Sequence, residues 1–284
     1  MSRDLSSLTL CQQIERSLQK KYREPIWGRF IAAIKEYDLI REGDRIAVCI
    51  SGGKDSMLLA KLMQMLQRRS DFPFTVEYLV MDPGYSPENR QKIVENAALL
   101  ELPIRIFQSD IFLAANRAEK NPCYLCARMR RGYLYQFARQ MGCNKIALGH
   151  HFSDVVETTL MGMLYGAQVQ TMLPKLHSKN FPGMELIRPL YLVHEDDILA
   201  WKQYHGLTFL QCACRFTEHT ATAGKETLSK RKETKALIRT LKETNPDVEY
   251  HIFRAMHTVN VDTALGWKRR GVEHSFLEEY EKDD

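Results

Sequence analysis

Short apolar runs alternate with amphipathic segments along residues 45–164 of the chain. The first apolar run, 45–50, leads into Ser51-Gly52-Gly53, a pattern typical of a buried strand that ends in a glycine loop, and a helical pattern starts at Ser56. The same alternation predicts further strands at 75–81, 104–107 and 145–149 and further helices at 87–100, 124–141 and 154–164. Strands that alternate with helices indicate an α/β fold with a doubly wound parallel sheet, in which ligands bind beyond the carboxyl ends of the strands.

The segments before and after this region follow other patterns. Apolar positions recur at helical spacing within residues 1–40, and residues 195–204 and 224–245 also have helical patterns, the last of them basic and polar. We therefore expect three parts: an N-terminal helical segment at 1–40, an α/β domain at 41–215 and a C-terminal helical, partly basic segment at 216–284.

The composition excludes several classes of protein. A chain of 284 residues with 44% hydrophobic and 26% charged residues is typical of globular proteins, and 15 Gly with 10 Pro exclude collagen and low-complexity chains. No apolar run approaches the roughly 18–20 residues of a membrane helix, and the first residues lack the pattern of a signal peptide. We expect a cytoplasmic protein without a membrane partner. The net charge of +5 is compatible with a polyanionic partner.

A glycine-rich loop separates the first predicted strand from the first predicted helix, and its residues are Ser51, Gly52, Gly53, Lys54, Asp55 and Ser56. Glycines let backbone N–H groups converge on an anion, and the N-terminus of the helix adds a partial positive charge. Lys54 and the two serine hydroxyls are candidate phosphate ligands. The loop is not a Walker A motif, because Asp55 follows the lysine. The alternative is a polar turn with a serine that caps the helix.

A second polar loop follows the predicted strand at 145–148. It contains Gly149, His150, His151 and, shortly after, Asp154, and the parallel topology predicts that it lies at the same edge of the sheet. A carboxylate there can hold Mg²⁺ against phosphate groups. The alternative for Asp154 is an acidic residue that stabilises the first turn of a helix. We expect neither histidine to act as a general base.

The cysteines fall into clustered and isolated positions. Cys123 and Cys126 form a Cys-x-x-Cys pair just before a predicted helix, and Cys212 and Cys214 lie far downstream. Such thiols suit structural zinc, an iron–sulfur cluster or a redox dithiol. Three further cysteines stand alone and are expected to be small buried residues: Cys11, Cys49 and Cys143.

Two basic groups accompany these motifs. Arg128, Arg130 and Arg131 follow the cysteine pair, and Arg128 and Arg131 share a helix face from which they can contact a phosphate or stabilise an intermediate. The later basic residues are Lys225, Lys230, Arg231, Lys232, Lys235, Arg239 and Lys242. They form a candidate surface for an RNA backbone, which binds with salt-dependent affinity. For both groups, solvated surface charge is the alternative.

Four collinear strings carry a family resemblance: SGGKDS at 51–56, CYLCARMRRG at 123–132, KIALGHH at 145–151 and IRPL at 187–190. Together they resemble the TtcA group, the tRNA 2-thiocytidine synthetases within the TtcA/TilS/TtuA superfamily of PP-loop proteins (N-type ATP pyrophosphatases). The resemblance extends from residue 18 to residue 215. It implies an adenine nucleotide alpha hydrolase-like fold and a reaction that converts ATP to AMP and pyrophosphate.

The resemblance also implies a chemistry. The C2 carbonyl of a tRNA pyrimidine, expected to be cytidine, is adenylated, and its oxygen is then replaced by sulfur that comes from a cysteine desulfurase or another sulfur donor. The implied cofactors are ATP, Mg²⁺ and a [4Fe–4S] cluster, and a homodimer is the state that related proteins suggest. By this resemblance Lys54, Asp154 and Arg131 are the expected catalytic residues, and Gly149 joins the loop at 51–56 in binding the nucleotide.

The implied cluster needs three thiolates. Cys123 and Cys126 correspond directly to the first two ligands, and Cys214 fits the spacing of the third best, with Cys212 as its competitor. The family has Gly-Ser-Gln after its third cysteine, whereas this chain has Arg215-Phe216 after Cys214. Because of this difference, the resemblance does not specify which base is modified.

Three other functions remain open from the sequence. A PP-loop ligase of the lysidine-synthetase kind would form a C–N bond on tRNA and would have no use for the cysteine cluster. An ATP-dependent enzyme that acts on a small metabolite would hold structural zinc in place of a cluster. The basic surface would then have no role in binding RNA. A nucleotide- or cluster-binding regulatory protein would turn over no ATP.

Overall fold

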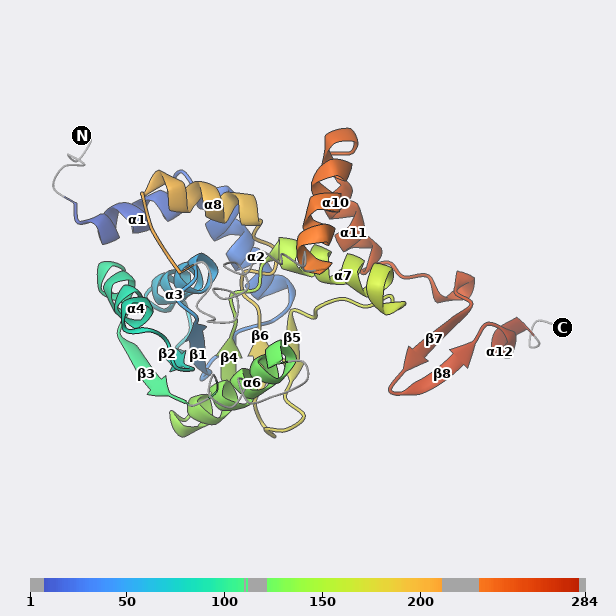
Figure 1. Ribbon diagram of the computed structural model, residues 1–284, viewed down its shortest axis with the longest axis horizontal. Coiled ribbons are helices and arrows are strands. Elements are labelled where there is room, and N and C mark those ends of the chain that lie inside the picture. The colour runs from blue at the N-terminus through green and yellow to red at the C-terminus, as the bar shows by residue number, and fades with distance from the viewer. Residues whose placement is uncertain (1–7, 110, 112–121, 211–229, 281–284) are drawn as a thin grey trace. The chain divides into compact units, whose positions relative to one another are not determined.

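A computed structural model of the chain describes residues 8–109, 111, 122–210 and 230–280. The described residues divide into two compact units (Figure 1). The first unit comprises residues 1–155 and 173–227, and the second comprises residues 156–172 and 228–284.

A six-stranded sheet forms the centre of the first unit, with the strand order β3-β2-β1-β4-β6-β5. The strands are β1 (Arg45–Ile50), β2 (Thr75–Asp82), β3 (Ile104–Gln108), β4 (Lys145–Ala147), β5 (Lys175–His177) and β6 (Glu185–Ile187). All neighbours pair in parallel except β5 and β6, which are antiparallel. The predicted α/β fold with a mostly parallel sheet is confirmed. The two strands that the sequence pattern did not predict, β5 and β6, have three residues each, too few to show a periodicity.

Helices cover both faces of this sheet. Alternate residues of β1 belong to different cores: Ile46 and Val48 pack with the helices of one face, and Ala47 and Cys49 pack with the other. The first face carries α1 (Leu10–Gln19), the π-helix η2 (Arg23–Gly28), α2 (Arg29–Glu36), α3 (Lys54–Gln67), α4 (Pro87–Leu99) and α8 (Glu195–Tyr204). The second face carries α6 (Pro122–Gln140). Burial on both faces explains why β1 is apolar throughout.

The direction of α6 matters for the cysteine pair. The helix begins at Pro122, so Cys123 and Cys126 lie within its first turns and not before it, as the sequence pattern had suggested. The chain leaves α6 through Cys143 and Asn144, whose backbone N–H donates to the carbonyl of Arg45 at the start of β1 (2.9 Å). Because α6 packs along β1, β2 and β4 and ends at their amino edge, its N-terminus points to their carboxyl edge.

The three isolated cysteines are buried, as predicted. The exposed fractions of Cys11, Cys49 and Cys143 are 3%, 6% and 5%. Burial raises the pKa of the Cys143 thiol to about 11. These thiols are therefore protonated and packed as small apolar groups.

The second unit contains helices and a hairpin. Helix α7 (Phe152–Gly166) contributes its residues from 156 onward, and α10 (Lys230–Thr244) and α11 (Val248–Ala255) follow. A short 3₁₀ turn, η3 (Val261–Thr263), leads to the antiparallel hairpin of β7 (Gly266–Arg269) and β8 (Val272–Ser275), and α12 (Leu277–Tyr280) comes last. The part of the predicted 224–245 helix that the structure describes is α10. Among the described residues of both units, no helix has the length and apolarity needed to span a bilayer.

Candidate functional site

The loop at 51–56 lies at the carboxyl end of β1, where the direction of chain crossover changes. β2 and β3 follow on one side of β1, whereas β4 and β6 lie on the other. This is the position at which open parallel sheets bind ligands.

Gly52 has a backbone conformation and surroundings that only glycine permits. Its φ angle is +84°, and an added Cβ atom would lie 2.7 Å from Ile93 Cγ1 and 2.8 Å from Leu210 Cδ1. The backbone N–H of Leu210 also donates to the carbonyl of Gly52 (3.1 Å). Leu210 therefore packs directly on the loop through both its side chain and its backbone.

The N-terminus of α3 is open to an anion. Its N-cap residue is Gly53, and no side chain caps it. The serines close the loop instead: Ser56 Oγ accepts from the backbone N–H of Ser51 (3.2 Å), and its hydroxyl donates to the carbonyl of Gly53 (2.9 Å). The serine-capped turn is therefore wrong as an account of this loop. First-turn amides without a side-chain cap are the usual ligands of phosphate groups.

Lys54 is held by two carboxylates. Its Nζ atom lies 3.1 Å from Asp55 Oδ2 and 3.2 Å from Glu195 Oε1, and Glu195 is the first residue of α8. Burial is the strongest single influence and lowers the pKa of Lys54, but the combined effect of the two carboxylates outweighs it and leaves the pKa raised. Lys54 is thus a fixed cation beside the open N-terminus of α3.

The loop after β4 packs against the same turn. An added Cβ atom at Gly149 would lie 3.0 Å from the backbone nitrogen of Ser56 and 3.1 Å from the carbonyl carbon of Asp55. Any larger residue would push the two loops apart. The prediction that the loops at 51–56 and 149–154 lie together at one edge is confirmed by this contact.

Asp154 and Asp55 both lie near the imidazole of His151. The Nε2 atom of His151 is 3.5 Å from Asp154 Oδ2 and 3.8 Å from Asp55 Oδ1. Asp154 Oδ2 also accepts from the backbone N–H of His151 (3.1 Å). Asp154 therefore stabilises the first turn of α7, which is the alternative role that the sequence indicated for it. The Oδ1 atom of Asp55 is buried and has no hydrogen-bond partner among the described residues.

Arg188 follows β6 at the same edge and is buried. Its pKa is lowered to about 10, chiefly by burial and also by the charge of Arg131, whereas Tyr191 and Asp154 raise it. The guanidinium NH1 atom donates to the carbonyl of Leu173, whereas Nε has no hydrogen-bond partner within the described part of the chain. Arg188 therefore brings a partly unsatisfied cation within electrostatic range of both Arg131 and Asp154.

A small cavity lies beside the loop, beyond β2 and β3. Its volume is about 320 Å³, and the residues that line it are Asp82, Gly84, Tyr85, Pro87, Arg90, Gln108 and Ser109. Asp82 is buried and accepts from the backbone N–H groups of Gly84 (2.9 Å) and Tyr85 (2.8 Å). β2 is the hydrogen-bonded neighbour of β1, so this cavity and the loop share one edge of the sheet.

The sequence patterns predict no role for Glu195, Arg188 or Asp82. Asp82 is the last residue of β2 and Arg188 directly follows β6, and the rule that ligands bind at the carboxyl ends of strands could have singled them out. Glu195 was recognised only as the first residue of a helical pattern. Its contact with Lys54 spans 141 residues and leaves no local trace in the sequence.

Cys212 and Cys214 lie outside the described residues, as does Lys225. Cys123 and Cys126 lie three residues apart in α6, a spacing that puts both positions on one helix face. Among the residues that the structure describes, no three His, Cys, Asp or Glu side chains are grouped closely enough to hold a metal ion.

The described basic residues of the late segment lie on α10 in the second unit. Lys230, Arg231, Lys232 and Arg239 are exposed. Two basic side chains pair with carboxylates of the same unit: Arg231 NH1 lies 3.5 Å from Glu157 Oε2, and Lys242 Nζ lies 2.7 Å from Glu249 Oε2. These two pairs contribute to the packing of the unit.

Comparisons with known proteins agree with this geometry. A family model described as a PP-loop domain matches residues 12–214. The chain is 33% identical over 248 residues to a protein of Anaeromyxobacter sp. (strain K), with 86% of this chain and 80% of that protein covered. It is 37% identical over 232 residues to a protein of Syntrophotalea carbinolica, with 80% and 86% covered. Both relatives are named tRNA-cytidine(32) 2-sulfurtransferase.

A solved structure has the same fold. It is the U34-tRNA thiolase NcsA from Methanococcus maripaludis with its [4Fe-4S] cluster. The superposition has a TM-score of 0.63 at 22% sequence identity and covers 81% of this chain and 76% of the other.

Proposed function

The chain belongs to the PP-loop family and, within it, to the group of the tRNA-cytidine(32) 2-sulfurtransferases, and on this premise we propose that it is an enzyme that thiolates tRNA in an ATP-dependent reaction. The observation that carries the proposal is the open N-terminus of α3, with Lys54 beside it and Gly149 packed against it. Such a site binds a polyphosphate.

The reaction consists of two displacements. The C2 carbonyl oxygen of a pyrimidine, with cytidine as the proposed base, attacks the α-phosphorus of ATP and releases pyrophosphate. A sulfur nucleophile then attacks C2, and AMP departs with the former carbonyl oxygen. Because pyrophosphate leaves in the first step, charge develops on the β- and γ-phosphates, and the amides of residues 51–56 together with Lys54 stabilise that charge.

Asp55 and Asp154 are the proposed Mg²⁺ ligands. The buried Oδ1 atom of Asp55 has no hydrogen-bond partner among the described residues, and Asp154 lies near the same Nε2 atom of His151 as Asp55 does. The oxygen Asp55 Oδ1 and a second carboxylate close by suit Mg²⁺, which prefers oxygen ligands and phosphate groups. When bound, Mg²⁺ neutralises phosphate charge.

Cys123, Cys126 and one of the two later cysteines are the proposed ligands of a [4Fe–4S] cluster, with Cys214 preferred over Cys212. Two observations support this assignment: the N-terminus of α6 points to the carboxyl edge, and Leu210 is bonded to Gly52. Cys212 is two residues beyond Leu210 and Cys214 four, so the covalent chain limits their separation from Leu210 to about 7 Å and about 14 Å. A cluster with three thiolate ligands supplies one iron that is free to bind sulfur.

Arg131 and Arg188 are proposed to stabilise the anionic adenylated base. Both lie within electrostatic range of one another at the edge that holds Asp154. The proposed partners are tRNA and a sulfur donor such as a cysteine desulfurase, and a homodimer is the proposed assembly. The exposed basic residues of α10 are proposed to contact the RNA backbone.

Two measurements test the proposal. Protein purified without oxygen should contain iron and acid-labile sulfide and should absorb in the thiolate-to-iron region, and a colourless protein that holds only zinc would contradict the cluster. Mass spectrometry of tRNA nucleosides from a deletion strain should show that one thiolated pyrimidine is missing. An unchanged thionucleoside profile would contradict tRNA thiolation.

The ligase alternative has its own test. A C–N bond-forming enzyme would keep its activity when Cys123 and Cys126 are both replaced by Ser, whereas the proposed enzyme loses thiolation. The Lys54→Ala variant, which should lose both ATP turnover and thiolation, is the positive control.

A further inference from the structure

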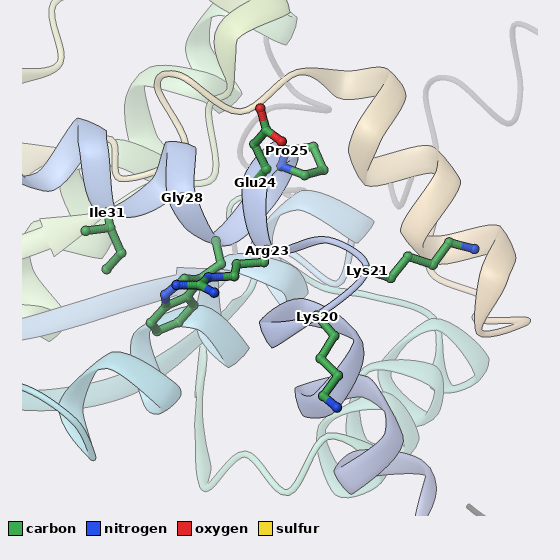
Figure 2. Close-up of a pocket in the computed structure, with 8 residues that line it drawn as sticks. Lys20, Lys21, Arg23, Glu24, Pro25, Gly28 and Ile31 are labelled. Carbon is green, nitrogen blue, oxygen red and sulfur yellow. The ribbon is translucent and has the colours of Figure 1, made fainter. Parts of the chain in front are cut away.

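The turn between α1 and α2 surrounds an open cavity that the proposed chemistry does not use. The cavity has a volume of about 640 Å³ and lies entirely within residues 20–31 of the first unit (Figure 2). Three of its lining residues are cationic, Lys20, Lys21 and Arg23, and one is aromatic, Trp27.

The positive charges of the cavity are available to a ligand. Lys20 and Arg23 are exposed, and neither forms an ion pair with another described residue. The Nζ atom of Lys21 lies 3.7 Å from the centre of the Tyr204 ring, a cation–π contact that holds its direction but leaves its charge uncompensated. Glu24 is the one carboxylate among the lining residues, and Figure 2 shows it pointing away from Arg23, which extends toward Ile31.

A π-helical turn builds the wall of the cavity. The carbonyl of Tyr22 accepts from the backbone N–H groups of both Ile26 and Trp27 (3.1 Å each), and Pro25 has no N–H to donate. The widened turn is tight at Gly28, where an added Cβ atom would lie 3.1 Å from the carbonyl oxygen of Arg23. Single π turns are rare within helices and are frequent at functional sites.

Helix α8 connects this cavity with the nucleotide loop. The hydroxyl of Tyr22 donates to the carbonyl of Ala200 (3.0 Å), and Arg29 NH1 pairs with Asp197 Oδ2 (3.0 Å). The first residue of the same helix, Glu195, contacts Lys54 at 3.2 Å. A ten-residue helix is about 15 Å long, so a bound polymer of nucleotides can reach from one site to the other.

We propose that the cavity of Lys20, Lys21, Arg23 and Trp27 is a docking site for the sugar–phosphate backbone and one unstacked base of the substrate RNA. This inference rests on the proposed function, which supplies the tRNA. Lysine and arginine bind phosphate groups, and a partly exposed indole such as Trp27 can stack with a base from a single-stranded loop. The combination of uncompensated cations and one aromatic ring favours RNA over an acidic protein surface, which would not require the ring.

Binding of unmodified tRNA, followed by fluorescence anisotropy over a series of salt concentrations, tests the proposal. The Lys20→Gln/Arg23→Gln variant should lose roughly tenfold in affinity near 0.1 M salt, and the slope of log K against log[salt] should flatten by about 1.5 because two phosphate contacts are lost. The control Lys35→Gln/Lys179→Gln changes the charge equally at two exposed positions outside the cavity and should bind like the wild type. Trp27→Leu should weaken binding several-fold without changing the slope.

A second readout does not depend on substitutions. In the wild-type protein, tRNA should protect Lys20 and Lys21 from acetylation, whereas ATP alone should not. Tight tRNA binding by the Lys20→Gln/Arg23→Gln variant, with unprotected lysines in the wild type, would overturn the docking site and leave the thiolase proposal standing. Loss of binding to an acidic sulfur-donor protein with unchanged tRNA affinity would overturn it as well. A wild-type protein that binds no tRNA would contradict both proposals.

Discussion

The Nζ atom of Lys54 lies 3.2 Å from the Oε1 atom of Glu195, so the cation of the nucleotide loop is held by the first residue of a helix that begins 141 positions later in the chain. The backbone N–H of Glu195 in turn donates to Ser153 Oγ in the first turn of α7 (3.3 Å). One residue therefore joins the two loops that are proposed to bind ATP, through its carboxylate on one side and its backbone N–H on the other. Glu195 is a positioning residue, because it acts through Lys54.

Glu195→Gln should lower the turnover of ATP by about tenfold, because the amide keeps the shape of the side chain but no longer orients the lysine charge. The KM for ATP should change less than the turnover, since the amides of the loop remain. Steady-state kinetics of pyrophosphate release measure both constants. The neighbouring Asp196→Asn is the control, and equal turnover in the two variants would contradict the positioning role.

Gly149→Ala should separate the two loops. Its Cβ atom would lie 3.0 Å from the backbone nitrogen of Ser56, and backbone cannot move aside as a flexible side chain can. We expect a stability loss of about 1–3 kcal/mol, measured by urea unfolding, together with weaker ATP binding. Gly132→Ala is the matched control, because an added Cβ there meets nothing within 4 Å and alanine favours the helix by up to about 1 kcal/mol.

Asp154→Asn should raise the Mg²⁺ concentration needed for ATP turnover by at least roughly tenfold, because a neutral amide is a weaker ligand of a hard cation than a carboxylate. Asparagine can still accept from the backbone N–H of His151, so α7 keeps its first turn. A Mg²⁺ titration of pyrophosphate release, with circular dichroism as a check on folding, measures the effect. An unchanged Mg²⁺ requirement would remove Asp154 from the proposed ligands.

Cys214→Ser should lower the iron content of anaerobically purified protein and abolish thiolation, whereas Cys212→Ser should retain both, because three thiolates are the minimum for the proposed cluster. Iron and acid-labile sulfide assays on the two variants decide between them. The opposite result would make Cys212 the third ligand. Cys143→Ser is the control, since this thiol is buried in the core between α6 and the sheet and is not among the proposed ligands.

Glu15 should make the stability of the first unit depend on pH. Burial raises the pKa of Glu15, but hydrogen bonds and charges from Lys61 (2.6 Å) and Arg68 (2.6 Å) outweigh it, and the pKa lies below its ordinary value of 4.5. The unfolded chain therefore binds the proton first, so this stabilisation is complete above pH 4.5 and is lost as the pH falls through the lower folded value. Urea unfolding between pH 3 and pH 7 measures the free energy of unfolding, which should fall less steeply toward acid pH in Glu15→Gln than in the wild type. Identical pH slopes in the two proteins would contradict the prediction.

Much of the fold could be predicted from local pattern. The run 45–50 is apolar throughout because β1 is covered on both faces, and the α8 pattern matched the observed helix, Glu195–Tyr204, at both ends. The short strands β5 and β6 could not be predicted, because their three residues become strands only through pairing, β6 with β4 and β5 with β6. The start of α6 was placed two residues late, since Pro122 is a good first-turn residue but is ambiguous in sequence.

The sequence by itself determined the chemistry that is available: a glycine loop with one lysine, a carboxylate after a later strand, and thiols in two groups. These features are local, since glycine conformation, helix N-termini and residue type do not depend on distant contacts. Only the tertiary structure decided which groups come together: Glu195 contacts Lys54, Gly149 packs on the first turn of α3, and Arg188 lies within electrostatic range of Asp154 and Arg131. The physical reason is that parallel strands bring distant loops to one edge, and the burial and charge that tune each group arise there from residues far away in the chain.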